Sequence, residues 1–312
     1  MRSNKILITG TTGFLGKHLL HSLENSDIVI LGRSKPENVH VSKFIQSDIN
    51  GDSNFTDAFS DVNVIVHCAA RAHVMNDDAK DPLREFREVN TLGTLNLATH
   101  AVEAGVKRFI YISSIKVNGE STTTGSPYRV SDALSPLDPY GQSKAEAEQQ
   151  LLALGKSSGM EIVIIRPPLV YGEGVKANFA SLMNLVGRGL PLPFRSINRN
   201  KRSMVSVYNL VDLILTCIKE PKAANQVFLA SDDNDLSTAE IVALMAKVQG
   251  KRNVALPVPV WLFDLAAKIL SKQDVVSRLT GSLQLDIEHT KNTLNWKPPY
   301  SVEHGFKLSV KK

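Results

Sequence analysis

The sequence has few of the features that mark secreted, membrane-spanning or disulfide-rich proteins. Its 312 residues include two cysteines, Cys68 and Cys217, too few for a disulfide framework. The first apolar run begins at Lys5, so no signal peptide is expected. The longest apolar stretch, residues 254–270, contains two prolines and an aspartate, and therefore predicts a turn and an amphipathic helix rather than an integral membrane segment. We expect a cytoplasmic protein.

That apolar stretch has a second interpretation. Its large side chains would also suit a membrane-surface role, although packing between domains is the simpler interpretation. The side chains concerned are Trp261, Leu262, Phe263 and Leu270.

Charge and composition are those of an ordinary globular protein. Lysine and arginine exceed aspartate and glutamate by 36 to 31, and the basic residues are scattered, with no run interleaved with aromatics. We therefore expect a small anionic ligand and no nucleic acid as partner. A hydrophobic fraction of 43% over 312 residues allows one large α/β domain with a smaller one appended.

A glycine-rich turn near the start predicts a dinucleotide-binding site. Residues 5–9 form an apolar run typical of a buried parallel strand, and helical periodicity follows. At this junction Gly10 permits a tight turn, Gly13 lets the backbone approach a pyrophosphate, and Gly16 allows close helix packing. An ordinary loop is the alternative, since the spacing differs from the commoner fingerprint. The residues expected to bind the cofactor here are Gly10, Thr12, Gly13, Phe14, Leu15 and Gly16.

The end of the second apolar run bears on which dinucleotide binds. Residues 27–31 lead into Gly32 and Arg33, where an NAD site usually carries an acid that accepts from the ribose 2′-hydroxyl. Arg33 offers a planar charged group suited to a 2′-phosphate, so we expect NADP in preference to NAD, with a solvated surface arginine as the alternative. Asp48 and Ile49 close the third strand and suit the adenine edge.

Tyr140 and Lys144 form a candidate proton-transfer pair. They are four residues apart on the helix expected after Pro139, so they share a face. A tyrosine acts as an acid or base near neutral pH only if its phenolate is stabilised, which a nearby cation can do. Ser114 follows a buried apolar run, residues 109–112, and ligands of open parallel sheets lie at the carboxyl ends of strands. We expect Ser114, Tyr140 and Lys144 to be catalytic, with Tyr140 and Lys144 also contacting the cofactor and Ser114 the substrate.

Strand-like and helical segments alternate through the first half of the chain and predict a doubly wound parallel sheet, an α/β fold of the Rossmann type. Expected strands span residues 62–68, 108–113 and 161–166, and expected helices lie near residues 82–104 and 140–154. After Gly172 the alternation is lost, until a strand at 204–208 and a helix at 209–218 resume it. The dinucleotide-binding domain is predicted over residues 1–171 and 202–230, and a smaller C-terminal substrate domain over 172–201 and 231–312.

Taken in order, the motifs of this chain resemble those of the extended short-chain dehydrogenase/reductases over essentially its whole length. The branch to which it looks most similar is that of the nucleotide-sugar epimerases and 4-ketoreductases. The motifs that carry the resemblance are the turn at residues 9–16, Asp48-Ile49, His67-Cys68-Ala69-Ala70, Asn90 to Thr94, Ser113-Ser114, Tyr140 with Lys144, and Arg166 to Gly172.

The resemblance implies an NAD(P)-dependent enzyme that acts on a UDP-linked sugar in surface-polysaccharide biosynthesis. It implies further cofactor contacts along the nicotinamide and its ribose, and a helix residue, Asn90, that supports this site. Those further cofactor residues are Ala69, Ala70, Arg71, Asn90 and Pro167. The substrate residues implied are Asn178, Arg202 and Arg278, of which Arg202 would grip the diphosphate. No metal site is expected.

The resemblance also implies a homodimer. In relatives of this fold, the helices corresponding to those near residues 82–104 and 140–154 pair across a dimer interface. An apolar stripe on the first of them fits this role, with ordinary packing onto the sheet as the alternative. The stripe consists of Leu92, Leu95, Ala98 and Val102.

Two departures from the family pattern narrow the expected reaction. The 4,6-dehydratases carry an Asp-Glu pair where this chain has Ile115 and Lys116, so dehydration is disfavoured. No cysteine follows Ser114, and His73 is the only nearby histidine of interest. We therefore expect hydride transfer at carbon 4, with net reduction of a UDP-4-keto-6-deoxy-N-acetylhexosamine favoured by Arg33. Two alternatives stay open: a UDP-hexose or N-acetylhexosamine 4-epimerase with tightly bound NAD, and a non-catalytic dinucleotide-sensing regulator.

Overall fold

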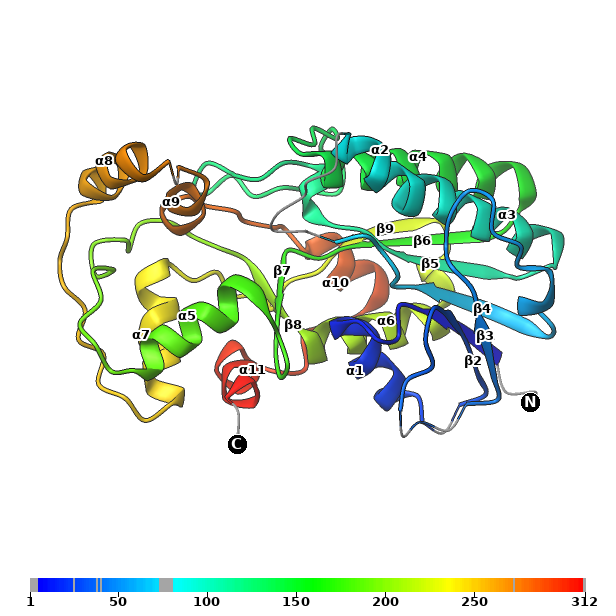
Figure 1. Ribbon diagram of the computed structural model, residues 1–312, viewed down its shortest axis with the longest axis horizontal. Helices are drawn as coiled ribbons and strands as arrows, with labels where there is room; N and C mark the ends of the chain where they lie inside the picture. Colours follow the sequence, from blue (N-terminus) through cyan, green and yellow to red (C-terminus); the bar gives the residue numbers. More distant parts are fainter. Residues whose placement is uncertain are drawn as a thin grey trace.

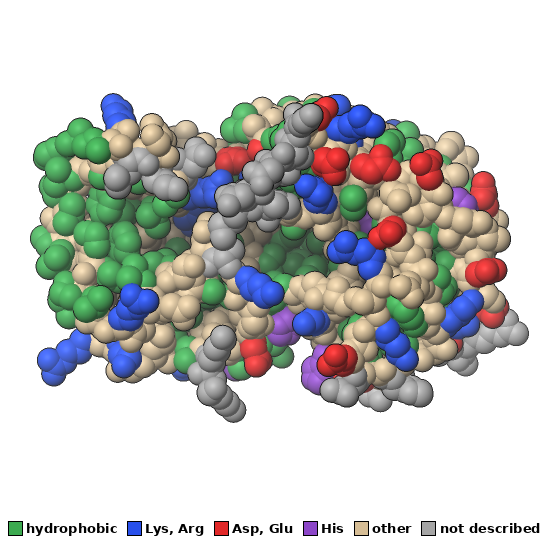
Figure 2. Space-filling model, viewed as in Figure 1, with side chains coloured by type: hydrophobic (Ala, Val, Ile, Leu, Met, Phe, Trp, Pro, Cys, Tyr) green, Lys and Arg blue, Asp and Glu red, His purple; other side chains and the backbone are tan. Residues whose placement is uncertain are grey.

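The computed structural model describes residues 5–24, 26–37, 39, 41–72, 81–271 and 273–310. These residues form two lobes, one built on a large sheet and one mainly of helices (Figure 1). On the face shown in Figure 2, charged side chains of both signs cover the sheet lobe, and hydrophobic ones gather over the helical lobe. Among the described helices, none combines the length and hydrophobicity needed to cross a membrane.

A seven-stranded sheet forms the larger lobe, and all its neighbouring strands are parallel. The order β3-β2-β1-β4-β5-β6-β9 reverses direction after β3, which confirms the predicted doubly wound topology. The strands are β1 Lys5–Thr9, β2 Ile28–Gly32, β3 Lys43–Gln46, β4 Val62–His67, β5 Arg108–Ile112, β6 Glu161–Arg166 and β9 Gln226–Leu229. The central strands are buried on both faces, as their continuous Val, Ile and Leu content predicts.

Helices cover both faces of the sheet and close a separate apolar core on each (Figure 1). Helices on the first face are α1 Phe14–Ser22, α6 Val207–Lys219 and α10 Glu288–Leu294. Those on the second face are α2 Pro82–Arg87, α3 Thr94–Glu103 and α4 Pro139–Ser158. Short 3₁₀ helices lie at Thr56–Ala58, Ile115–Val117 and Pro221–Ala223.

The helical lobe has its own apolar core, which includes Tyr171, Phe179, Met245 and Phe306. A two-stranded parallel sheet, β7 Leu169–Tyr171 with β8 Met204–Ser206, borders it. The helices of this lobe are α5 Ala177–Gly187, α7 Thr238–Val248, α8 Val260–Leu270, α9 Gln273–Thr280 and α11 Val302–Ser309. They lie beside the sheet lobe, at the left of Figure 1.

The division into two domains remains a prediction, and late parts of the chain contribute to the sheet lobe. Trp296 belongs to the first core, and its indole N–H donates to Asp212 Oδ1 over 2.7 Å. The Thr290 hydroxyl donates to Leu229 O over 2.8 Å. The segment around α10 therefore lies against the last strand of the sheet.

Some expected element bounds differ from those observed. The third strand ends at Gln46, so Asp48 and Ile49 lie beyond it. The strand expected at residues 204–208, which is β8, ends at Ser206 instead of Tyr208. Its end has a physical cause, because the Ser206 hydroxyl caps α6 by accepting from the Tyr208 N–H over 3.2 Å.

The helix expected near residues 82–104 is interrupted by a π-helix, Glu88–Gly93. At its end Gly93 lies against the backbone of Ile49, where a Cβ would come within 2.8 Å of carbonyl carbon and oxygen. The close approach of the loop after β3 thus requires glycine here. Such wide turns are frequent at functional sites, and this one lies beside the catalytic helix.

The expected apolar stripe on this helix is only partly exposed. Ala98 is fully buried against the sheet, and Val102 packs on the same core. Leu92 is 46% exposed and Leu95 half-buried. The sequence interpretation of a continuous dimer stripe was therefore wrong for Ala98 and Val102, since these two residues face the sheet.

Candidate active site

The turn between β1 and α1 has the geometry that a dinucleotide phosphate needs. Gly10 has a φ of +71°, and a Cβ there would lie 2.6 Å from the Ala69 nitrogen. A Cβ on Gly16 would lie 2.2 Å from the Gly10 oxygen, so only glycine allows this packing of α1. Gly13 is the N-cap of α1, and no described side chain caps it or places an acid in the first turn. The backbone N–H groups at the start of α1 therefore suit an anion, such as the pyrophosphate of a dinucleotide.

The other residues predicted for the adenine half lie at the same edge of the sheet. Arg33 is exposed directly after β2, and beyond the end of β3 Asp48 is exposed and Ile49 half-buried. Carboxyl ends of parallel strands share one edge, so these residues are near the phosphate turn. Thr12, Phe14 and Leu15 belong to that turn and to the start of α1. Their contacts with a cofactor remain predictions.

Asn90 supports the segment where the nicotinamide is predicted. Its Oδ1 accepts from the Arg71 N–H over 2.9 Å, and its Nδ2 donates to Arg71 O over 3.1 Å. The same Nδ2 donates to Ser143 Oγ of α4 over 3.1 Å. Asn90 thus connects the segment after β4 with the catalytic helix through its side-chain amide. Nearby, the Ala69 N–H donates to Thr9 Oγ1 over 3.1 Å.

Ser114, Tyr140 and Lys144 meet at the carboxyl end of β5. Tyr140 and Lys144 stand on successive turns of α4, and the Tyr140 side chain is hydrogen-bonded to Ser114. Lys144 is 1% exposed, and its Nζ donates to Ile112 O over 2.9 Å. The same Nζ lies 4.4 Å from the centre of the Tyr111 ring. This arrangement can pass a proton to or from a substrate oxygen near Ser114 and Tyr140.

Burial dominates the acid-base properties of this pair. It raises the pKa of Tyr140 to about 12, the charge of Asp138 adds to the rise, and the hydrogen bond with Ser114 lowers it. Burial also lowers the pKa of Lys144 from 10.5 to about 7, against the opposing effects of Cys68 and Glu148. Lys144 is not among the groups that shift the Tyr140 pKa, so the expected lowering by this cation is not seen in this structure.

A charged cluster that the sequence did not assign fixes the start of α4. Asp138 caps the helix by accepting from the Gly141 N–H over 2.6 Å, and it also pairs with Lys116. Lys116 donates to Glu120 over 2.9 Å as well. Lys116 stands where dehydratases carry an acid, and here it holds the helix that bears Tyr140.

His67 is a second residue that the sequence did not single out for a role. It ends β4, its Nδ1 lies 2.7 Å from Thr9 Oγ1, and its Nε2 lies 3.0 Å from Thr94 Oγ1. Burial, followed by the charge of Lys144, lowers the pKa of His67 to about 3, so the ring is neutral. It therefore links β1 to α3 beneath the site. The sequence marked His67 only as part of the motif His67-Cys68-Ala69-Ala70, without a role of its own. His73, the histidine considered for a role, lies outside the described residues.

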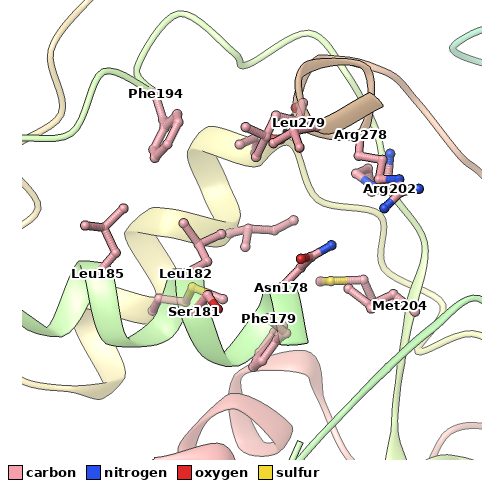
Figure 3. Close-up of a pocket in the computed structure, with 15 residues that line it drawn as sticks. Asn178, Phe179, Ser181, Leu182, Leu185, Phe194, Arg202, Met204, Arg278 and Leu279 are labelled. Atoms are coloured by element: carbon pink, nitrogen blue, oxygen red, sulfur yellow. Dashed lines mark hydrogen bonds between the residues drawn. The ribbon is translucent and has the colours of Figure 1, made fainter. Parts of the chain in front are cut away.

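Three predicted substrate residues line one cavity of about 380 Å³ in the helical lobe (Figure 3). Asn178 comes from α5, Arg202 from the segment before β8, and Arg278 from α9. Ser114 is not among the lining residues. The others are Leu169, Phe179, Ser181, Leu182, Leu185, Phe194, Met204, Thr238, Ile241, Met245, Val275 and Leu279.

Arg202 and Arg278 form a cationic pair at one end of this cavity, where Figure 3 shows them close together. Burial, then the charge of Arg278, lowers the pKa of Arg202. Among the described residues neither makes an ion pair, and the Arg202 Nη1 donates to Gly281 O over 3.2 Å. Two guanidinium groups without an acid favour a bound diphosphate.

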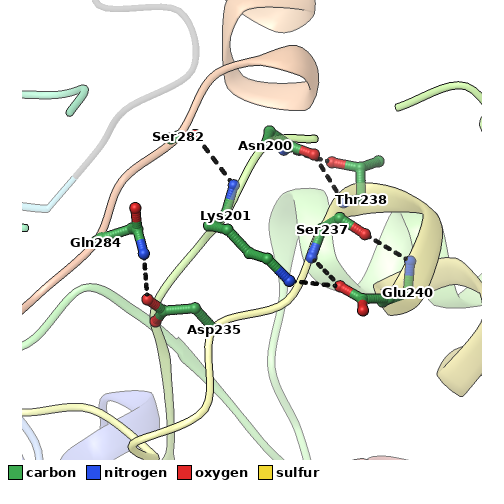
Figure 4. Close-up of polar contacts among 8 residues, drawn as sticks. All are labelled: Asn200, Lys201, Asp235, Ser237, Thr238, Glu240, Ser282 and Gln284. Carbon is green, nitrogen blue, oxygen red and sulfur yellow. Dashed lines mark hydrogen bonds and ion pairs between the residues drawn. The ribbon is translucent and has the colours of Figure 1, made fainter. Parts of the chain in front are cut away.

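The segment that carries Arg202 is fixed on both sides. The Arg202 N–H donates to Leu236 O over 2.9 Å, and the Leu283 N–H donates to Lys201 O over the same distance. Side chains reinforce this junction, since Lys201 pairs with Glu240 over 3.2 Å (Figure 4). The Arg202 segment is therefore held by two other segments that are distant from it in the sequence, around Leu236 and Leu283.

The fold and the geometry at the end of β5 define a dinucleotide-dependent enzyme of the short-chain dehydrogenase/reductase type. Residues 6–230 match the model of the NAD dependent epimerase/dehydratase family, and the chain belongs to this family.

Named relatives narrow the comparison. The chain is 56% identical over 308 residues to a UDP-glucose 4-epimerase of Vibrio cholerae, covering 98% of this chain and 94% of the relative. It is 26% identical to the N-acetyl-alpha-D-glucosaminyl-diphospho-ditrans,octacis-undecaprenol 4-epimerase of Escherichia coli O157:H7, covering 97% and 93%. A UDP-N-acetylglucosamine 4-epimerase structure from Bacillus cereus superposes with a TM-score of 0.80 at 21% identity, covering 98% and 97%. The last likeness concerns the fold alone.

These comparisons overturn the expected reaction. Net reduction of a 4-keto-6-deoxy sugar was the leading interpretation, and the similarity to the V. cholerae 4-epimerase along 98% of the chain contradicts it. The argument for reduction depended on a single side chain, Arg33, which is exposed. The 4-epimerase alternative is the better supported of the two.

Proposed function

We propose that this enzyme inverts carbon 4 of a UDP-linked hexose, with UDP-glucose and UDP-galactose as the pair to test first, using tightly bound NAD. The observation that carries the proposal is the 56% identity to a UDP-glucose 4-epimerase over 98% of the chain. The intact set of Ser114, Tyr140 and Lys144 at the end of β5 supports it.

The roles proposed for the site residues follow from their positions. Tyr140 and Ser114 hold the oxygen on carbon 4, and Tyr140 takes its proton and later returns it. Lys144 positions the cofactor ribose beside Tyr140. When bound, NAD supplies the hydride acceptor at carbon 4 and later returns the hydride. The turn at Gly10 to Gly16 holds the pyrophosphate.

We propose that the substrate diphosphate lies at Arg202 and Arg278. Inversion requires that both faces of the sugar reach the same catalytic group, so the sugar must turn while the rest of the substrate stays bound. An anchor away from the reacting carbon permits this. The cationic pair is such an anchor, because it lies in the helical lobe and Arg202 is fixed there by backbone pairing with Leu236 and Leu283.

We propose NAD as the cofactor, instead of the NADP expected from Arg33. An epimerase regenerates its oxidised cofactor in every cycle and needs no exchange with a reducing pool. The family description names NAD, and Arg33 is an exposed side chain. Denaturing the purified protein and identifying the released dinucleotide tests this point directly.

The test of function is an assay without added cofactor. Purified protein incubated with UDP-glucose should form UDP-galactose, measured by chromatography. Tyr140→Phe should lower turnover by about two to four orders of magnitude, because it removes the proton relay, while the bound dinucleotide is retained. Tyr300→Phe, at an exposed tyrosine in the loop before α11, is the matched control and should keep full activity. Consumption of added NADPH without epimer formation would contradict the proposal.

A further inference from the structure

Helix α8 is hydrophobic almost all round, yet it lies on the surface. Nine of its eleven residues, VWLFDLAAKIL, are apolar. Trp261 is 61% exposed and Ile269 is 73% exposed, whereas Ala267 is buried. Helices of this composition are normally buried in a protein core or in a membrane. The described part of the chain leaves most of α8 uncovered.

The exposed side chains of α8 belong to a larger surface, which we call the apolar patch. Figure 2 shows hydrophobic side chains gathered at the end of the molecule where Figure 1 places α8 and the segment leading to it. Soluble monomers rarely expose a contiguous surface of this kind unless it binds something. The patch consists of Val254, Leu256, Val260, Trp261, Leu262, Leu265, Ile269 and Val275.

The apolar patch continues into the cavity that holds the cationic pair. Val275 of α9 is 50% exposed and also lines the cavity. Phe263 of α8 stacks on Phe194, another lining residue, with ring centres 6.2 Å apart. Apolar side chains of α8 and α9 therefore connect the wall of the cavity with the patch.

The cavity offers few partners to a polar ligand apart from the cationic pair. Ten of its fifteen lining residues are apolar, and Asn178, Ser181 and Thr238 are the uncharged polar ones. The Thr238 hydroxyl already donates to Leu279 O over 2.5 Å and accepts from Asn200 Nδ2 over 3.1 Å. Buried polar groups need hydrogen-bond partners, whereas an isoprenoid chain needs none. The cavity thus combines an anion clamp with a hydrocarbon-like wall.

Charges beside the apolar patch are mainly positive. Lys251, Arg252 and Lys268 are exposed near it, and Asp264 is the exposed acid on α8. Basic residues beside an apolar helix favour the surface of a membrane that contains anionic lipids.

We propose that the apolar patch docks on an anionic lipid surface, and that the cavity takes a polyisoprenyl diphosphate-linked sugar. The enzyme then inverts carbon 4 of lipid-linked as well as UDP-linked hexoses. The diphosphate lies at Arg202 and Arg278, and the isoprenoid chain runs along the cavity wall to α8. The inference rests on the proposed function for its chemistry, since the C4–H bond that breaks is re-formed on the other face and no further reactant is needed.

The experiment uses vesicles of phosphatidylethanolamine and phosphatidylglycerol, with and without polyisoprenyl diphosphate-linked glucose. The protein should float with the vesicles and form the galactose epimer on the lipid carrier. Trp261→Glu and Ile269→Glu should each lower flotation and lipid-linked turnover about tenfold or more, because each removes one large apolar side chain from the contact. Turnover of UDP-glucose should stay within about twofold of the wild type. Leu308→Glu, at an exposed leucine of α11, is the control and should behave as wild type.

The outcomes separate this inference from the proposed function. Turnover of UDP-glucose with neither flotation nor lipid-linked turnover overturns the inference and leaves the function standing. Flotation that depends on the patch and increases with the lipid-linked sugar, but without epimerisation of either substrate, supports the docking and contradicts the function. Self-association abolished by Ile269→Glu, in protein that does not float, assigns the patch to a second copy of the chain and also overturns the inference.

Discussion

Lys144 lies in an environment far from its ordinary one in water. Its ammonium group is 1% exposed, and one backbone oxygen, of Ile112, accepts from it within the described part of the chain. The face of Tyr111 supplies a second, weaker attraction. These contacts do not replace the lost hydration, so the pKa falls to about 7. A bound anionic or hydroxylic partner would restore the charge.

Lys144 should therefore make stability depend on pH. Between its folded pKa of about 7 and its ordinary value of 10.5, the unfolded chain binds more protons than the folded one, so stability rises with pH across that range. Lys144→Met should remove this rise. At pH 6 the variant should be more stable than wild type by up to about 5 kcal/mol, and the difference should shrink by pH 9, because each tenfold change in proton affinity corresponds to about 1.4 kcal/mol and the pKa falls from 10.5 to about 7.

Urea unfolding at the two pH values measures this difference. Lys156→Met, at an exposed position of the same helix, is the control and should show no such dependence. A constant gap between wild type and Lys144→Met at both pH values would mean that the buried ammonium is not the cause.

At the residue scale, the sequence predicted those site residues that lie close together in the chain at a spacing typical of a helix. Tyr140 and Lys144 are one helical turn apart, so their juxtaposition follows from helix geometry. His67 and Thr9 are 58 positions apart and come together only when β1 and β4 pair. No local pattern records that contact, which is why His67 was missed.

At the scale of the element, a substitution in the β1–α1 turn tests how much the close packing of α1 contributes to stability. Gly16→Ala should force α1 away from the strand, because the new Cβ would lie 2.2 Å from the Gly10 oxygen. We expect a loss of stability of about 1–3 kcal/mol, as for other overpacked sites, together with loss of the copurifying dinucleotide. Thermal unfolding and the absorbance of released cofactor measure both effects.

Gly32→Ala is the matched control, since no atom lies within 4 Å of the position that its Cβ would take. It stands at the end of β2, beside Arg33, and should keep both stability and cofactor. If Gly16→Ala behaved the same way, the close approach at this turn would have no energetic importance.

The elements themselves were largely predictable, and their irregularities were not. Strands such as β5 and β6 are buried on both faces and therefore appear as continuous apolar runs. At the end of the π-helix Glu88–Gly93, Gly93 lies against the backbone of Ile49, which is a tertiary contact. Periodicity alone predicts a continuous helix and does not show which of its apolar residues pack on the sheet, so the burial of Ala98 was misjudged.

At the scale of the whole molecule, we still expect a homodimer. Leu92 remains 46% exposed and Leu95 half-buried, next to α4. Leu92→Glu should convert a dimer into a monomer in sedimentation experiments at micromolar concentration, because a buried unpaired charge would disfavour the interface. Leu137→Glu, in the loop before α4, is a control at another exposed leucine. A wild-type protein that sediments as a monomer would contradict the dimer.

Of the large-scale organisation, the sheet lobe could be predicted from the sequence and the cavity of the helical lobe could not. The alternation of strands and helices predicts the sheet lobe because each unit is local. The helical lobe is assembled from separate segments, and its apolar cavity has no sequence signature, since its lining residues extend from Leu169 to Leu279. The three predicted substrate residues were found by resemblance, and their shared cavity only by the structure.

The backbone contacts of Arg202 bear on the order in which the parts of this chain assemble during synthesis. The phosphate turn and α4, together with Arg166 of β6 that pairs with Glu148 of α4, precede β7 in the sequence, so they can assemble while the rest of the chain is still being made. The backbone of Arg202 is completed by Leu236 and Leu283, which are synthesised later. A nascent or truncated chain can therefore acquire its dinucleotide site well before its diphosphate site. We therefore expect cofactor capture to precede substrate binding in each molecule, and a chain that ends before Leu283 to bind the sugar nucleotide poorly.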